Sequence, residues 1–197
     1  MNFKKIILWY LFLFLVSFFC FRFFWLFNNF SIYPYIIGSL PLIIFIILPL
    51  KIYPHFFERE FKNNFFIAIF LGLISGLLIA LFFRLFSSDF YGFFENNFLF
   101  GFFYWLFISF SQEMFFRAFL LKEIKKRYSL FLSLVINSFL FSLWHLTVPF
   151  SPVWLTFSGL LRVFIVSLIW GYLYLKTKNL LSCFISHFLV GILLSQF

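Results

Sequence analysis

Long apolar runs separated by short polar segments dominate this sequence. Interrupted by Lys, Asn, Pro and acidic residues, the runs cover 6–27, 33–52, 64–87, 97–121, 129–148, 153–175 and 179–197. Each run is long enough to cross the hydrocarbon core of a bilayer, which takes about 20 helical residues. Backbone polar groups in hydrocarbon must be satisfied within the segment, and the period-two alternation of barrel strands is absent. The pattern therefore predicts an all-α, polytopic transmembrane helix bundle of about seven spans.

Composition supports an integral membrane protein. Hydrophobic residues make up 64% of the chain and charged residues 11%, far from the balance of a soluble domain. No Gly/Ser-rich or Pro-rich linker separates the runs, so we expect one membrane domain. Cys20 and Cys183 both lie inside apolar runs, where cysteine behaves as a small hydrophobe, and we expect no disulfide.

The charges predict an orientation. The net charge is +9, and most of it falls on alternate loops of the seven-span arrangement. These basic residues are Lys4, Lys5, Lys51, Arg59, Lys62, Lys122, Lys125, Lys126, Arg127, Lys176 and Lys178. By the positive-inside rule we expect these loops and the N-terminus to be cytoplasmic. The membrane itself is expected to be a bacterial plasma membrane. Topology and anionic headgroups account for the charge, so we expect the lipid bilayer and no nucleic acid as a partner.

One apolar stretch, FSQEMFFRAFLL, carries Gln112, Glu113 and Arg117 within a predicted span. An ionisable side chain at mid-bilayer costs at least about 2.5–3.5 kcal/mol, which makes it a functional candidate. Glu113 and Arg117 are four residues apart and can meet on one helix face. Two interpretations follow: an ion pair that only anchors the helix, or part of a reactive site.

Two histidines lie in later predicted spans, His145 in FSLWHL and His187 in CFISHFLVG. Each alone is typical of a hydrogen-bonded packing residue, but together with Glu113 they provide a base, a water-holding imidazole and a proton donor for hydrolysis. They are also a possible metal set with Cys183, although the spacing fits no established zinc pattern. Helix rise places Glu113 and His187 about 12–16 Å from the cytoplasmic side, and His145 about 24 Å.

Taken in order, the stretches QEMFFR (112–117), FSLWH (141–145) and HFLVG (187–191) resemble motifs of the CPBP family of intramembrane proteases. This family includes type II CAAX prenyl endopeptidases and bacterial relatives linked to bacteriocin processing and self-immunity. Its pattern is EExxxR, then FxxxH, then a final His with Asn four residues later. The resemblance covers about residues 95–197, which implies N-terminal transmembrane helices over 1–94 and a catalytic helical core over 95–197.

Two positions depart from the family pattern. Gln112 replaces the first Glu, which in the family is taken to be the water-activating base, and Gly191 replaces the final Asn. An amide can hold a water molecule but cannot take its proton at neutral pH. The resemblance thus implies either that Glu113 has become the base or that the chain is an inactive relative.

Our leading hypothesis is an intramembrane endopeptidase that cleaves a membrane-associated protein or precursor peptide. Glu113 is expected to be the general base, Gln112 to hold the water and Arg117 to fix Glu113, while His145 and His187 orient the water and stabilise the oxyanion. No cofactor is expected, although a divalent metal at Glu113, His145 and His187 stays open. The alternatives are a non-catalytic binding or immunity protein, and an ion-coupled transporter that uses Glu113 and Arg162.

Overall fold

The computed structural model describes residues 3–27, 33–86, 98–147 and 156–195, and within these ranges all regular structure is helical. The predicted all-α bundle is therefore confirmed. Its elements are α1 (Phe3–Phe27), α2 (Tyr33–Ile52), α3 (Phe56–Phe61), α4 (Phe65–Phe86), α5 (Phe98–Glu113), a π-helix (Met114–Leu121), α6 (Lys122–Lys125), α7 (Leu130–Trp144), a 3₁₀ turn (His145–Thr147), α8 (Phe157–Thr177) and α9 (Leu181–Ser195).

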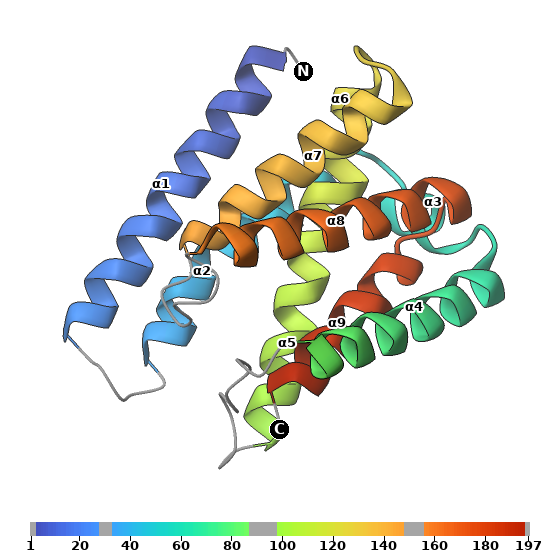
Figure 1. Cartoon of the computed structure of the whole chain (residues 1–197). Helices are drawn as coiled ribbons and strands as arrows, with labels where there is room; N and C mark the ends of the chain where they lie inside the picture. Colours follow the sequence, from blue (N-terminus) through green and yellow to red (C-terminus); the bar gives the residue numbers. More distant parts are fainter. Residues whose placement is uncertain (1–2, 28–32, 87–97, 148–155, 196–197) are drawn as a thin grey trace.

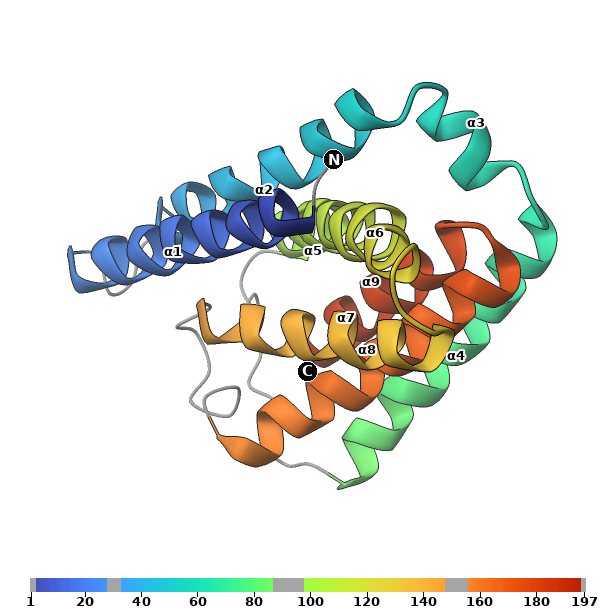
Figure 2. The ribbon, with the colours of Figure 1, turned by 90° about the horizontal axis from the view of Figure 1, so that it is seen from above.

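The helices surround α5, which runs through the middle of the bundle. Seen from above in Figure 2, α5 is viewed nearly end-on, with α1 and α2 on one side and α7 and α8 on another. Helices α4 and α9 lie side by side on the third side, as Figure 1 also shows. Because α7 runs obliquely to α5 and α8 runs across it, depth in the membrane does not follow from residue counts alone (Figures 1 and 2).

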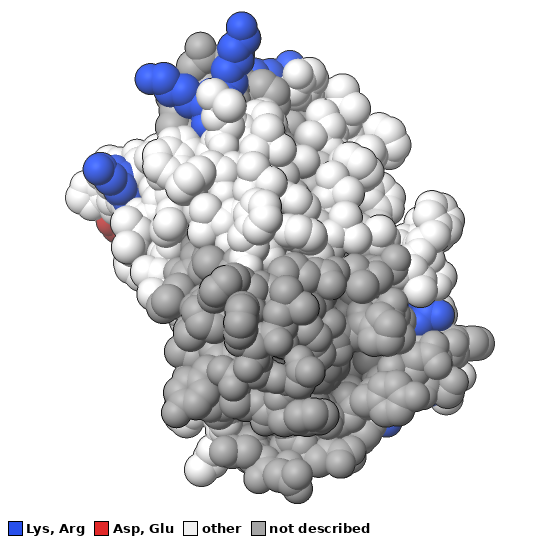
Figure 3. Space-filling model, turned by 90° about the vertical axis from the view of Figure 1, so that its left-hand side faces the viewer, with Lys and Arg blue, Asp and Glu red and all other residues white. Residues whose placement is uncertain are grey.

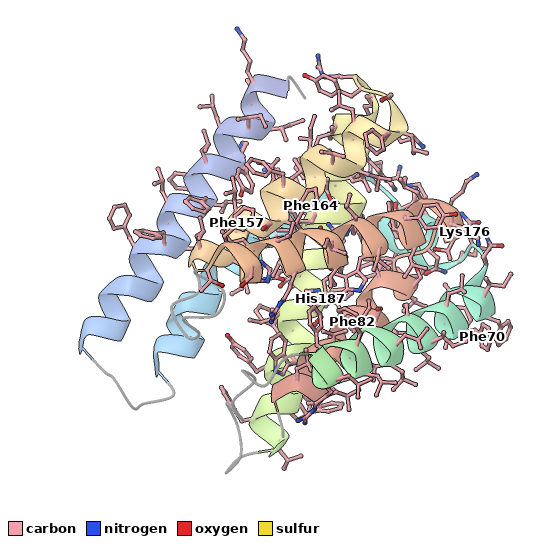
Figure 4. The ribbon with its side chains drawn as sticks, in the orientation of Figure 1. Phe70, Phe82, Phe157, Phe164, Lys176 and His187 are labelled. Atoms are coloured by element: carbon pink, nitrogen blue, oxygen red, sulfur yellow. The ribbon has the colours of Figure 1, made fainter. Side chains whose placement is uncertain are left out.

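Much of the outer surface is apolar, as expected for a protein in lipid. In the described part of the chain, four helical segments are long and apolar enough to cross a membrane: 65–85, 99–125, 130–147 and 157–177. Phe66 on α4 is 83% exposed, and Phe70 and Phe82 also point outward from this helix (Figure 4). On the face drawn in Figure 3, several Lys and Arg side chains lie at the top, and the described surface directly below them is largely uncharged. The chain is an integral membrane protein.

Helices α4 and α9 pack closely through the small residues of GLISG, residues 72–76. A Cβ atom at Gly72 would lie 2.8 Å from the carbonyl oxygen of Ser182, and one at Gly76 would lie 3.0 Å from the Cα of Ser186. Glycine is needed at both positions because the backbones approach each other directly, the usual arrangement of small-xxx-small motifs in membranes. Close packing against α4 thereby holds α9, the helix that carries His187, in position.

We expect Gly72→Ala to lower the free energy of unfolding by about 1–3 kcal/mol, because the new methyl group meets a backbone oxygen that cannot move aside. Thermal unfolding in detergent micelles measures this change. Leu77→Ala is the matched control, since Leu77 lies on the same helix and is 53% exposed. Equal melting temperatures for the two variants would show that α4 and α9 do not pack through these glycines.

Sequence reasoning missed α3, a short helix in the polar segment between the second and third predicted spans. Its Glu60 is only 1% exposed and pairs with Lys122, with Arg59 Nε at 3.0 Å, and with Tyr174, whose hydroxyl donates to Oε2 at 2.7 Å. The backbone of Glu60 also accepts a hydrogen bond from Leu180 N at 2.7 Å. These contacts fix the loop between α8 and α9, and with it the start of α9.

Candidate active site

Glu113 lies where α5 changes into a π-helix. The eight π-helical residues that follow it are all buried, so this wider turn runs through the core of the bundle. Such segments are rare and frequently occur at functional sites. In this protein the change of winding falls directly between Glu113 and Arg117, the two charged residues of the FSQEMFFRAFLL stretch.

The Glu113 carboxylate contacts a cation and an imidazole and is inaccessible to solvent. Its Oε1 accepts a hydrogen bond from His187 Nδ1 at 2.8 Å, across from α9. Its Oε2 lies 3.1 Å from Arg117 Nε, close enough for an ion pair but not aligned for a hydrogen bond. The buried Cys183 thiol, one turn before His187 on α9, donates to the carbonyl oxygen of Leu180 at 3.2 Å. Charge compensation by Arg117 allows the carboxylate to be ionised in a buried position.

Arg117 is held by residues that sequence reasoning did not select. Its guanidinium donates to Asn137 Oδ1 at 2.7 Å and to Ser167 Oγ at 3.0 Å, and its Cζ lies 4.8 Å from the centroid of the Phe141 ring. Asn137 in turn donates to the carbonyl oxygen of Phe116 at 2.8 Å, within the π-helix. An amide deep inside the fifth predicted span was the available signal, because polar groups in hydrocarbon need a partner.

His187 is fixed by aromatic rings as well as by Glu113. Trp170 stacks on its ring with a centroid distance of 4.2 Å and an interplanar angle of 20°. The indole N–H of Trp170 donates to Ser186 Oγ at 2.9 Å, which locks the ring in place. Phe141 meets His187 edge-on at 5.9 Å. Figure 4 shows His187 near the middle of the bundle, beside α5.

His145 reaches the same region despite its greater predicted depth. It follows α7 directly, and its ring centroid lies 4.9 Å from that of Phe141, which also contacts His187. It is close enough to His187 and Arg117 to interact with them electrostatically. The predicted depths of His145 and Glu113 differed because residue counts treat all helices as parallel, whereas α7 crosses α5 obliquely (Figure 1). His145 Nδ1 lies 3.0 Å from the carbonyl oxygen of Phe141 and donates to it.

Gln112 has the expected location but does not share the contacts of Glu113. It is only 4% exposed, and its Oε1 is buried without a hydrogen-bond partner. Successive helical residues point about 100° apart, which explains why Gln112 and Glu113 face different surroundings. An unpaired buried amide oxygen is costly, and a water molecule or a substrate donor can satisfy it.

The structure thus brings Glu113, Arg117 and His187 into direct contact and places His145 beside them through Phe141, with Gln112 adjacent in the chain. Within the described ranges, no three His, Cys, Asp or Glu side chains are grouped closely enough to hold a metal ion. What the arrangement offers is a buried carboxylate–imidazole pair whose charge is balanced by one guanidinium.

Comparison with known protein families shows a match. The family model described as type II CAAX prenyl endopeptidase Rce1-like matches residues 94–193, a region that contains α5 and all five predicted site residues. No match was found among curated proteins or among solved structures.

Proposed function

Because the chain belongs to the Rce1-like family of type II CAAX prenyl endopeptidases, we propose that it is an intramembrane endopeptidase whose hydrolytic water is activated by the Glu113–His187 pair. The family implies a membrane-associated protein or peptide as the substrate. The observation that carries the proposal is the 2.8 Å hydrogen bond between Glu113 Oε1 and His187 Nδ1 inside the bundle.

This hydrogen bond sets the tautomer of His187. A carboxylate can only accept, so the imidazole proton resides on Nδ1 and Nε2 carries a lone pair. Sequence reasoning assigned the base to Glu113 itself; the geometry favours His187 Nε2 as the group that takes the proton, with Glu113 as the residue that orients it. Arg117 Nε, 3.1 Å from Oε2, holds the carboxylate in the required position.

The proposed reaction follows general base catalysis. Water attacks the carbonyl carbon of the scissile peptide while one of its protons moves to His187 Nε2, and the Glu113 carboxylate stabilises the imidazolium. The same proton then passes to the leaving nitrogen as the C–N bond breaks. His145 Nδ1–H donates a hydrogen bond to the Phe141 carbonyl, so Nε2 carries a lone pair. This lone pair can accept a hydrogen bond from the second O–H of the water and so orient it. The Gln112 amide has an oxygen to hold the water and an NH₂ group to stabilise the oxyanion.

A second candidate is a relative that binds membrane peptides without hydrolysing them. The observation that favours it is Gln112, an amide at the position where the family has a carboxylate base. In that case the Glu113–Arg117–His187 cluster is a structural ion pair that holds α5 and α9 together.

Reconstituted protein and a panel of membrane-anchored reporter peptides distinguish the two candidates. We expect cleavage by the wild type and a loss of about 10²-fold with Gln112→Ala, the usual cost of removing one polar group at such a site. Phe66→Ala is the matched control, because this side chain is 83% exposed on α4. Cleavage by Gln112→Glu but not by the wild type would instead identify an inactive relative.

A further inference from the structure

The indole of Trp105 lies directly on the backbone of Gly191. A Cβ atom at Gly191 would lie 2.3 Å from Cε3, 2.5 Å from Cδ2 and 2.9 Å from Cζ3 of this ring. Real Cβ atoms do not approach ring carbons this closely, so any side chain at position 191 requires the indole to move. The indole therefore fills the volume into which a side chain at this position would project.

Each partner of this contact shares a helix face with one predicted site residue. Gly191 follows His187 by one turn of α9, about 6 Å along the axis. Trp105 precedes Gln112 by seven residues on α5, which places the two on nearly the same helix face. Trp105 is only partly buried, whereas Gln112 is buried with its Oε1 unpaired. The indole therefore lies against α9 one helical turn beyond His187.

The edge of the ring that meets Gly191 is hydrocarbon. Cε3 and Cζ3 belong to the six-membered ring, opposite the edge that carries the N–H group. Where the family pattern has an asparagine amide, this chain therefore presents the apolar edge of Trp105. This hydrocarbon edge limits the space at Gly191, one helical turn from His187.

We infer that Trp105 is a specificity-determining residue that forms an apolar wall next to His187 and restricts the substrate to a small side chain, such as Gly, Ala or Ser, where the peptide passes Gly191. This inference rests on the proposed function. It also means that asparagine cannot be restored at position 191 alone, because the indole occupies its place.

The test compares wild type, Trp105→Ala and the control Phe103→Ala, a lipid-facing α5 variant whose native side chain is 62% exposed. The probe is a set of membrane-anchored reporter peptides that differ only in Ala or Leu at each position around the cleaved bond. We expect wild type and Phe103→Ala to prefer Ala over Leu at one position by about 10-fold or more, and Trp105→Ala to lose this preference. An unchanged preference in Trp105→Ala would overturn the inference.

Two further measurements keep this inference separate from the proposed function. If no variant cleaves any peptide, the proposed function fails, and photo-crosslinking of the same peptides then tests the role of Trp105. Capture of the Leu peptides by Trp105→Ala but not by the wild type supports the inference. Equal capture by the wild type and by Trp105→Ala overturns it. Independently, Gly191→Asn should lower the melting temperature and Trp105→Ala should restore it in the double variant. Failure to restore it would contradict the steric contact.

Discussion

Replacing Glu113 by glutamine is expected to lower kcat for peptide cleavage by about 10⁴-fold, the loss seen when the orienting carboxylate of a catalytic histidine becomes an amide. Arg117 Nε lies 3.1 Å from one carboxylate oxygen and His187 Nδ1 lies 2.8 Å from the other. The amide oxygen of the variant will turn toward the guanidinium, which leaves its NH₂ group facing Nδ1. Two donors cannot share one hydrogen bond, so the imidazole proton moves to Nε2, which then carries no lone pair for the water.

A double-mutant cycle with His187→Ala checks this explanation in proteoliposomes. If the carboxylate and the imidazole act as one unit, the double variant will be no slower than the slower single variant. Rates are normalised to the folded fraction, because Glu113→Gln also weakens the charge balance around Arg117. Losses that multiply in the double variant would show that Glu113 and His187 act separately, as expected if Glu113 itself took the proton from water.

Hydropathy was sufficient to locate the long helices, because lipid leaves an apolar chain few alternatives to helix. The seven predicted runs correspond to α1, α2, α4, the continuous helix from α5 to α6, α7, α8 and α9. The six residues of α3 gave no such signal, since the burial of Glu60 depends on Lys122 and Tyr174, which are far away in the sequence. The GLISG glycines were visible in the sequence, but their partner on α9 was not.

At the site, local spacing was informative and long-range geometry was not. Four-residue spacing predicted the contact between Glu113 and Arg117, which the structure shows at 3.1 Å. The π-helix after Glu113 has the sequence MFFRAFLL, which gives no signal that distinguishes it from an ordinary α-helix. The contact between Trp105 and Gly191 joins residues from two helices whose packing no single-sequence pattern specifies. The role given to Gln112 stays a prediction that the Gln112→Ala assay tests, and the role given to His145 also stays a prediction.

Arg117→Met is expected to reduce the free energy of unfolding by about 3–5 kcal/mol, the usual cost of removing one partner from a buried ion pair. Arg117 and Glu113 are both 0% exposed, so the carboxylate would remain in the core without a counter-charge. Asn137 Oδ1 and Ser167 Oγ would also lose the donors that now reach them at 2.7 and 3.0 Å. Chemical or thermal unfolding in micelles, with helicity as the readout, measures the effect.

Two comparison variants identify the cause. Arg59→Ala removes a half-exposed arginine that also contacts a buried glutamate, and it should cost less than about 1 kcal/mol because solvent screens the pair and Lys122 still compensates Glu60. Adding Glu113→Gln to Arg117→Met should recover part of the lost stability, since the uncompensated charge is then gone. If the double variant is instead less stable than Arg117→Met alone, the buried charge is not what destabilises the core, and the polar contacts of Arg117 with α7 and α8 are the larger contribution.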